Sequence, residues 1–161
     1  MPGHFRWLWV LLLILGGCAA TTEPWRLPDG ARPALSQRWL AGDGRYAWPP
    51  DDGYAAPPVL VVLPAGVLLD RFGGPGGSFL SPHGAGFDAR ALPSQCQDML
   101  RQYHVYEVVR PLPVWAGKAA PWFDEPGGAT QFKTDAPVTT LLDDHTLVEP
   151  TPPPAPPRCP N

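Results

Sequence analysis

Proline and glycine constrain this chain more than any other residues, because 24 Pro and 17 Gly supply about a quarter of its 161 positions. That content lies at the lower edge of the range typical of disordered proteins. A wholly disordered chain would be poor in aromatic residues, whereas this one holds 7 Trp, 6 Phe and 4 Tyr and is 44% hydrophobic. Prolines gather in residues 150–161. We therefore expect one folded domain followed by a Pro-rich tail.

The charge of the chain excludes one class of ligand. The formal net charge is −3, and the 12 Lys and Arg residues form no run. Binding to nucleic acid depends on a basic face, so we expect no nucleic-acid partner. No apolar stretch reaches 18 residues, and the sequence therefore predicts no membrane-spanning helix.

The first 17 residues have the pattern of a secretory signal peptide. Arg6 precedes a short apolar run at residues 7–15, and Leu15-Gly16-Gly17-Cys18 resembles the bacterial lipobox. This resemblance implies that Cys18 carries lipid and begins the mature chain, which would anchor the protein in a membrane. The following Ala19-Ala20 favours export across the inner membrane and sorting to the outer membrane. An ordinary signal peptide, cleaved nearby, is the alternative.

Two further cysteines, Cys96 and Cys159, belong to the mature chain. Exported proteins fold in an oxidising compartment, where an even pair of cysteines forms a disulfide more readily than a metal site. A bond between them would fix the tail to the domain. Two unpaired thiols are the alternative.

The remaining sequence predicts an α+β fold, a small, strand-rich single domain with short helices. We expect a tether over 18–41, the domain over 42–149 and the tail over 150–161. Strands are expected where β-branched and apolar residues lie between turn signals, at 59–63 (buried), 67–72, 103–110, 111–117 (an edge or bent strand), 130–133 and 146–148. Short helices are expected at 95–102, with Ser94 as N-cap, and at 137–144.

Common catalytic motifs are absent from the sequence. There is no HExxH, Walker, GxSxG or CxxC pattern, and Gly73–Gly77 lacks the spacing of a Rossmann loop. His83, His104 and His145 are scattered without ligand spacing, so we expect no metal site.

Six blocks nevertheless follow one another in a specific order. They are Asp70-Arg71-Phe72-Gly73, Ser78–Pro82, Arg90–Pro93, Tyr103–Val108, Ala120–Phe123 and Pro126–Phe132. In this order they resemble the tuberculosis necrotizing toxin family of NAD glycohydrolases, from Leu63 to Val148. The resemblance implies cleavage of the nicotinamide–ribose bond of NAD or NADP, which is then the substrate, with no cofactor required. It also implies a fold distantly similar to ADP-ribosyltransferases, and an immunity protein as a possible partner.

The resemblance assigns catalysis to two residues. Arg71 matches a position suited to gripping the pyrophosphate, because a guanidinium binds phosphate oxygens in pairs. Gln131 could bind a ribose hydroxyl or position water without adding charge. The alternatives are an ion pair of Arg71 with Asp70 or another surface acid, and a solvated Gln131.

Four more residues are expected to bind substrate: Phe79, Arg90, Trp122 and Phe123. Phe79 would stack on nicotinamide or wall the pocket, unless it belongs to the core. Arg90 would contact a second phosphate or hold its own loop. The other two aromatic residues would build the pocket wall.

Two positions depart from the family pattern. Asp124-Glu125 replaces an uncharged pair, and its charge would repel the substrate if it faced the pyrophosphate. Ala129 replaces a third glycine, which costs stability if that position needs a positive φ.

Two other classes of function remain open at the level of sequence. One is ADP-ribosyl transfer to a protein, which the absence of a Glu-x-Glu pair near Gln131 argues against. The other is a binding lipoprotein on a degenerate domain, which the retention of Arg71 and Gln131 argues against.

Overall fold

The computed structural model describes residues 37–43, 45–93 and 96–159. The expected signal peptide, Cys18, most of the tether and the Ser94 cap lie outside these residues. The strands are β1 (Val59–Leu63), β2 (Leu68–Phe72), β3 (Phe79–Pro82), β4 (Tyr103–Val108), β5 (Leu112–Lys118), β6 (Thr130–Lys133) and β7 (Leu147–Val148). The helices are α1 (Cys96–Met99) and α2 (Val138–Asp143), with 3-10 turns at Gln37–Trp39, Asp51–Gly53, Asp88–Arg90 and Leu100–Gln102. No described helix has the length and hydropathy to traverse a bilayer.

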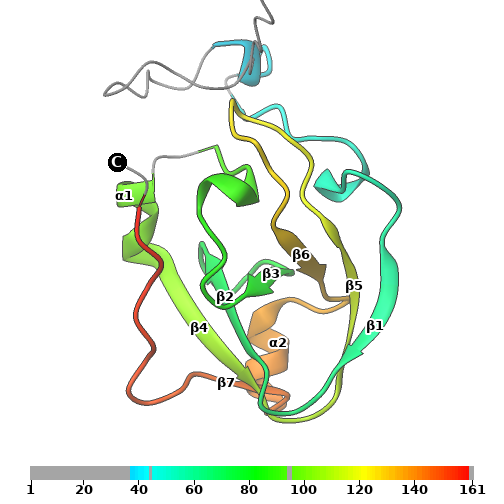
Figure 1. Ribbon diagram of the computed structural model, residues 1–161, viewed down its shortest axis with the longest axis vertical. Coiled ribbons are helices and arrows are strands. Elements are labelled where there is room, and N and C mark those ends of the chain that lie inside the picture. Colours follow the sequence, from blue (N-terminus) through cyan, green and yellow to red (C-terminus); the bar gives the residue numbers. More distant parts are fainter. Residues whose placement is uncertain (1–36, 44, 94–95, 160–161) are drawn as a thin grey trace, which may run out of the picture.

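The described strands form one antiparallel sheet in the order β1-β5-β6-β3-β2-β4-β7 (Figure 1). Alternation of side chains along the strands places Leu69, Leu80 and Phe132 in the main core cluster, where they meet Val138 and Leu141 of α2. This arrangement confirms a small, strand-rich domain with short helices. It also makes β6, β3 and β2 neighbours, and the site is built on these three strands.

The sequence predicted the positions of β1 and β5 correctly but the environment of β1 wrongly. β1 is an edge strand, and Val59, Leu60 and Val62 are 62%, 58% and 60% exposed. Val61 and Leu63 of this strand pack against the core. Of the two alternatives for β5, an edge strand or a bent strand, the edge is excluded, because β5 lies between β1 and β6 with Pro113 paired opposite Val62.

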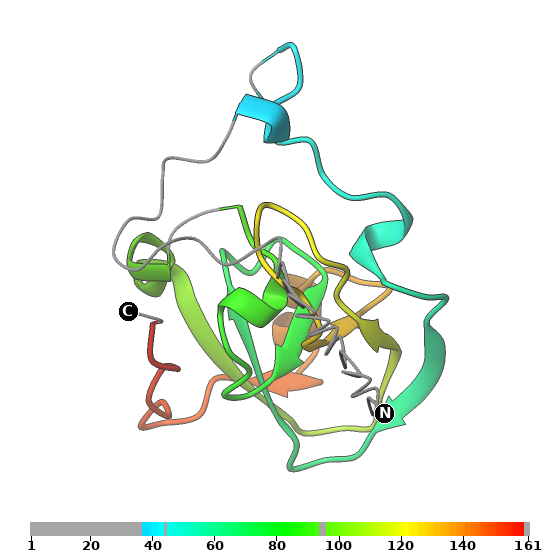
Figure 2. The same ribbon diagram turned by 45° about the horizontal axis from the view of Figure 1, so that its top comes forward.

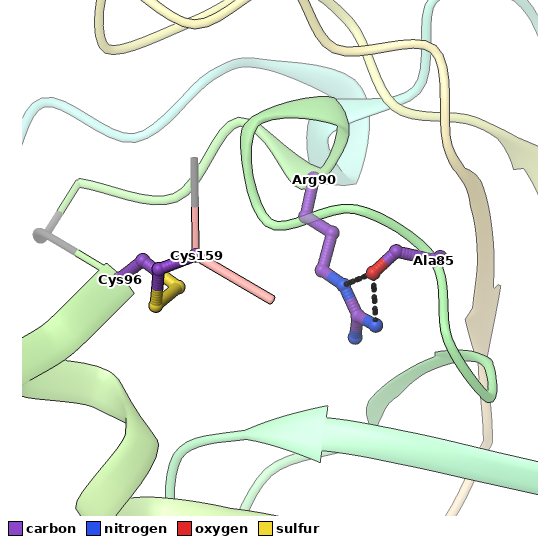
Figure 3. Close-up of a disulfide and its surroundings, with 4 residues drawn as sticks. All are labelled: Ala85, Arg90, Cys96 and Cys159. Atoms are coloured by element: carbon purple, nitrogen blue, oxygen red, sulfur yellow. Dashed lines mark hydrogen bonds between the residues drawn. A yellow bond between two sulfur atoms is a disulfide. The ribbon is translucent and has the colours of Figure 1, made fainter. Parts of the chain in front are cut away.

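A disulfide joins the two cysteines that the sequence pairs. The Sγ atoms of Cys96 and Cys159 lie 2.07 Å apart, and Cys159 packs against a small cluster containing Phe72 and Phe87. The tail, which has neither helix nor strand over 149–159, runs back past β4 to α1 (Figure 1), and Figure 3 shows the disulfide at the end of this path. The bond therefore closes the tail onto the domain beside the loop that carries Arg90.

Removal of this bond is expected to destabilise the fold. The two cysteines are 63 residues apart, and closing a loop of this length is worth on the order of 4 kcal/mol in the chain-entropy model. We expect the Cys96→Ser/Cys159→Ser double variant to lose about that free energy of unfolding in urea titrations. Non-reducing peptide mapping of the native protein should recover one linked peptide. Labelling of both cysteines by a thiol reagent in the native, unreduced protein would contradict the bond.

Candidate functional site

Four of the predicted site residues line one pocket. β2, β3 and β6 supply Arg71, Phe79 and Gln131, while the turn Asp88–Arg90 supplies Arg90. The other lining residues are Asp70, Phe72, Leu80, Ser81 and Leu92. The pocket has a volume of about 60 Å³, whereas sites that enclose whole ligands hold roughly 300 to 1,000 Å³. It can therefore enclose only one part of a large ligand.

Arg71 is half-buried at this pocket, and backbone oxygens hold its side chain. Its Nε donates to the carbonyl oxygen of Gly74 and its Nη1 to that of Phe79, each at 2.8 Å. Burial lowers the pKa of Arg71, and no carboxylate of residues 37–43, 45–93 and 96–159 forms an ion pair with it. A partly buried cation without a counter-charge is costly. An anionic ligand could supply the missing partner.

The glycine-rich loop makes room for this guanidinium. A Cβ on Gly77 would lie 2.0 Å from Nη2 of Arg71, so only glycine fits there without moving the side chain. Gly73 has a φ of +110°, which residues with side chains rarely adopt. The loop Gly73–Gly77 therefore allows the guanidinium of Arg71 to occupy its position.

The guanidinium of Arg90 binds other groups of the protein and is therefore not free for a ligand. Its Nη1 lies 2.6 Å from Oδ1 of buried Asp70, and its Nε and Nη2 donate to the carbonyl oxygen of Ala85 at 3.2 and 2.8 Å (Figure 3). Its guanidinium also lies over the ring of Phe72, 4.9 Å from the centroid. This arrangement favours holding the loop over binding a second phosphate. It also overturns the alternative that Arg71 pairs with Asp70.

The buried carboxylate of Asp70 binds two further groups besides Arg90. Its Oδ2 accepts hydrogen bonds from the hydroxyl of Tyr103 at 2.7 Å and from the backbone N–H of Gly84 at 2.9 Å. Burial and the adjacent Asp70 carboxylate raise the pKa of Tyr103 well above its ordinary value. Asp70 and Arg90 thus fix the loop over 84–90 against β2 as one wall of the pocket.

Gln131 and Phe79 are both placed for contact with a ligand. Nε2 of Gln131 donates to the main-chain oxygen of Asp52 at 2.9 Å, so the side chain is held in the structure rather than merely solvated. Phe79 is half-buried at the pocket and lies outside the core clusters. Nζ of Lys133 lies 5.9 Å from its ring centroid. Phe79 therefore forms a wall of the pocket.

Trp122 and Phe123, which the sequence predicts to build the pocket wall, do not line this pocket. They lie in an aromatic cluster that forms around a tight turn at 122–125. Trp122 contacts Trp39 at 5.0 Å between ring centroids, and Phe123 contacts Trp39, Tyr46 and Trp48 at 5.7, 5.8 and 5.3 Å. Figure 1 shows the 37–42 segment above the loop that joins β5 to β6, and Figure 2 shows it from another side. These ring contacts attach the segment that contains Trp39, Tyr46 and Trp48, called the N-terminal segment below, to that loop.

The residues that depart from the family pattern, Asp124, Glu125 and Ala129, do not line this pocket. Asp124 accepts a hydrogen bond from Nε1 of Trp39 at 2.7 Å and forms an ion pair with Arg38, so it faces the N-terminal segment. Ala129 is not among the residues with positive φ, a conformation that Gly127 and Gly128 adopt at +68° and +91°. Ala129 therefore carries no backbone penalty.

Asp52 contacts two side chains of β6, and these contacts were not predicted from the sequence. Besides accepting from Gln131, it places Oδ2 2.6 Å from Nζ of Lys133. In the sequence, the Asp52-Gly53 turn marks a bend but not the residue that the bend contacts. Within the described ranges, no three His, Cys, Asp or Glu side chains come together as a possible metal site.

Comparison with known proteins shows the family to which the chain is related. The sequence model of the family described as Tuberculosis necrotizing toxin matches residues 62–149. The conidial surface nicotinamide adenine dinucleotide glycohydrolase nadA of Aspergillus fumigatus is 40% identical over 119 residues, which are 67% of this chain and 51% of that protein. The chain thus spans about half the length of this curated relative.

A solved structure shares the fold. The tuberculosis necrotizing toxin, complexed with its immunity factor IFT, superposes with a TM-score of 0.54 at 24% identity. The match covers 68% of this chain and 65% of that one. At this level of identity the likeness shows the fold alone.

Proposed function

The chain belongs to the tuberculosis necrotizing toxin family, and we propose on this premise that its domain hydrolyses NAD or NADP to nicotinamide and ADP-ribose. The observation that carries the proposal is the pocket that Arg71, Phe79 and Gln131 line together. The name of the 40% identical relative, an NAD glycohydrolase, supports the same chemistry.

The reaction makes modest demands on the protein. Nicotinamide leaves as a neutral molecule, so no strong general acid is needed, and the ribose passes through a state resembling an oxocarbenium ion. Water then adds to the ribose carbon and loses a proton. The protein must hold the dinucleotide and orient its ribose.

Arg71, Gln131 and Phe79 would each have a different role in this reaction. Arg71, which lacks a carboxylate partner among the described residues, would bind the oxygens of the pyrophosphate. Gln131 would hydrogen-bond the nicotinamide ribose or the attacking water. Phe79 would lie against the nicotinamide ring, because aromatic rings stack in offset or edge contacts.

One assay distinguishes the candidate classes of function. Purified protein is incubated with NAD, and free nicotinamide, free ADP-ribose and protein-bound ADP-ribose are measured. We expect nicotinamide and free ADP-ribose in equal amounts. ADP-ribose on protein would indicate a transferase, and intact NAD would indicate a binding protein without activity.

Gly77→Ala tests whether activity depends on the position of the Arg71 guanidinium, because the variant keeps the charge of Arg71. The added Cβ would occupy the place of Nη2, so the guanidinium must move out of its position. We expect kcat/KM for NAD to fall about tenfold, on the scale of one charge-assisted hydrogen bond. Gly76→Ala is the matched control, since a Cβ there meets no atom within 4 Å. Equal activity of the two variants would contradict this role of Gly77.

We extend the proposal to a surface-anchored form of the enzyme. The relative from Aspergillus fumigatus is named as a conidial surface protein, which supports a place outside the cytoplasm. Lipidation at Cys18, the outer membrane and an immunity partner stay predictions from the sequence. Cys18→Ser should release the domain into the soluble fraction or block its processing. Unchanged processing and membrane partition would defeat the lipobox interpretation.

A further inference from the structure

The orientation of the Gln131 amide can be deduced from its partner. Nε2 lies 2.9 Å from the main-chain oxygen of Asp52, and a carbonyl oxygen can only accept a hydrogen bond. The amide nitrogen must therefore face Asp52. The reverse orientation would place two oxygens against each other.

This orientation decides which end of the amide can meet a ligand. Because the amide nitrogen of Gln131 donates to the main-chain oxygen of Asp52, the amide oxygen is the group left for a ligand.

The segment that holds Gln131 is itself tightly constrained. Asp51, Asp52 and Gly53 have φ values of +53°, +55° and +77°. Such left-handed residues are costly and persist only where the surroundings fix them, often at functional sites. Here the N–H of Ala120 donates to the carbonyl oxygen of Gly53 at 2.8 Å, which attaches the turn to the residues after β5.

An ion pair fixes the turn to the strand that carries Gln131. Oδ2 of Asp52 lies 2.6 Å from Nζ of Lys133, two residues along β6. Alternate residues of a strand project from the same face, so Gln131 and Lys133 both reach Asp52. Asp52 thus binds one side chain through its carboxylate and the other through its backbone.

We propose that Asp52 is a positioning residue that presents the amide oxygen of Gln131 to the substrate as a hydrogen-bond acceptor. This proposal rests on the proposed function. It assigns Gln131 a partner of defined chemistry, a donor such as a hydroxyl of the nicotinamide ribose.

Two alanine variants that differ by one position test the proposal. Asp51→Ala and Asp52→Ala each place alanine at a left-handed residue. The Asp51 carboxylate forms no hydrogen bond or ion pair with any described residue, whereas Asp52 contacts Gln131 and Lys133. We expect Asp52→Ala to lower kcat for NAD about tenfold with KM within twofold. Asp51→Ala has the same cost of alanine at a left-handed residue but keeps both contacts of Asp52, so it should keep the wild-type kcat. Asp52→Asn, whose amide oxygen can still accept a hydrogen bond from Nζ of Lys133, should restore most of the activity.

A spectroscopic measurement reports the position of Gln131 without any activity. The side-chain amide signal of Gln131 in a ¹⁵N-labelled protein, assigned by its loss in Gln131→Ala, should shift in Asp52→Ala and not in Asp51→Ala. Equal kcat or an unmoved amide signal in the two alanine variants would overturn the proposal. Failure of the wild-type protein to release nicotinamide would instead overturn the proposed function, while the amide signal would still test the contact.

Discussion

Gln131→Ala is expected to lower kcat and kcat/KM for NAD together, by about 10²- to 10³-fold. The side chain lines the pocket from β6, and its proposed partner is the reacting ribose or the attacking water. A contact that strengthens in the transition state contributes to turnover more than to ground-state binding. Initial rates over a range of NAD concentrations would separate the two parameters, and KM should change little.

The fold should survive this change, because Gln131 belongs to neither core cluster. Thermal unfolding of the variant checks this point. Thr130→Ala serves as the control on the same strand, since Thr130 accepts from Lys118 and does not line the pocket. A folded Gln131→Ala protein that cleaves NAD at the wild-type rate would remove Gln131 from the site.

The sequence predicted the strands well because local signals define them. Tyr103–Val108 lies between a short helix and Pro111. Val59–Leu63 lies between Pro57-Pro58 and the turn Pro64-Ala65-Gly66. Composition did not reveal how many neighbours each strand has. β1 is as apolar as a central strand, yet it pairs only with β5 and leaves three side chains exposed.

The site was predicted through ordered motifs rather than through local physics. The sheet order explains why these motifs converge, since β6, β3 and β2 are adjacent. The ion-pair partner of Asp70 was harder to predict from the sequence. Asp70 and Arg71 are neighbours in the sequence, but successive side chains of a strand point to opposite faces. Asp70 therefore meets Arg90, twenty residues away, and Arg71 has no carboxylate partner among the described residues.

Long-range packing explains the contacts that the sequence did not predict. Trp122 and Phe123 have the composition of a pocket wall, but their partners lie near residues 39–48, more than seventy positions away. The hydrogen bond between Gln131 and Asp52 spans 79 positions. No periodicity or motif in a single sequence links such segments.

Arg71→Ala should weaken both binding and turnover, with kcat/KM for NAD about 10²-fold lower. Charge-assisted hydrogen bonds contribute roughly 1.5 to 3 kcal/mol each, and loss of a phosphate contact would also misplace the ribose. Arg71→Lys keeps the charge but cannot reproduce the planar fork, so we expect an intermediate loss. Arg110→Ala is the matched control, because Arg110 binds Asp144 and Thr146 and does not line the pocket.

The chemistry of the contact can be tested with a smaller substrate. Nicotinamide riboside carries the same scissile bond as NAD but no phosphate. If Arg71 grips the pyrophosphate, wild type and Arg71→Ala should cleave nicotinamide riboside at similar rates, although they differ strongly on NAD. A loss of equal size on both substrates would place Arg71 at the ribose or in support of Phe79, to whose carbonyl oxygen it donates. The ratio of the two losses therefore assigns Arg71 to the phosphate or to the reacting end of the substrate.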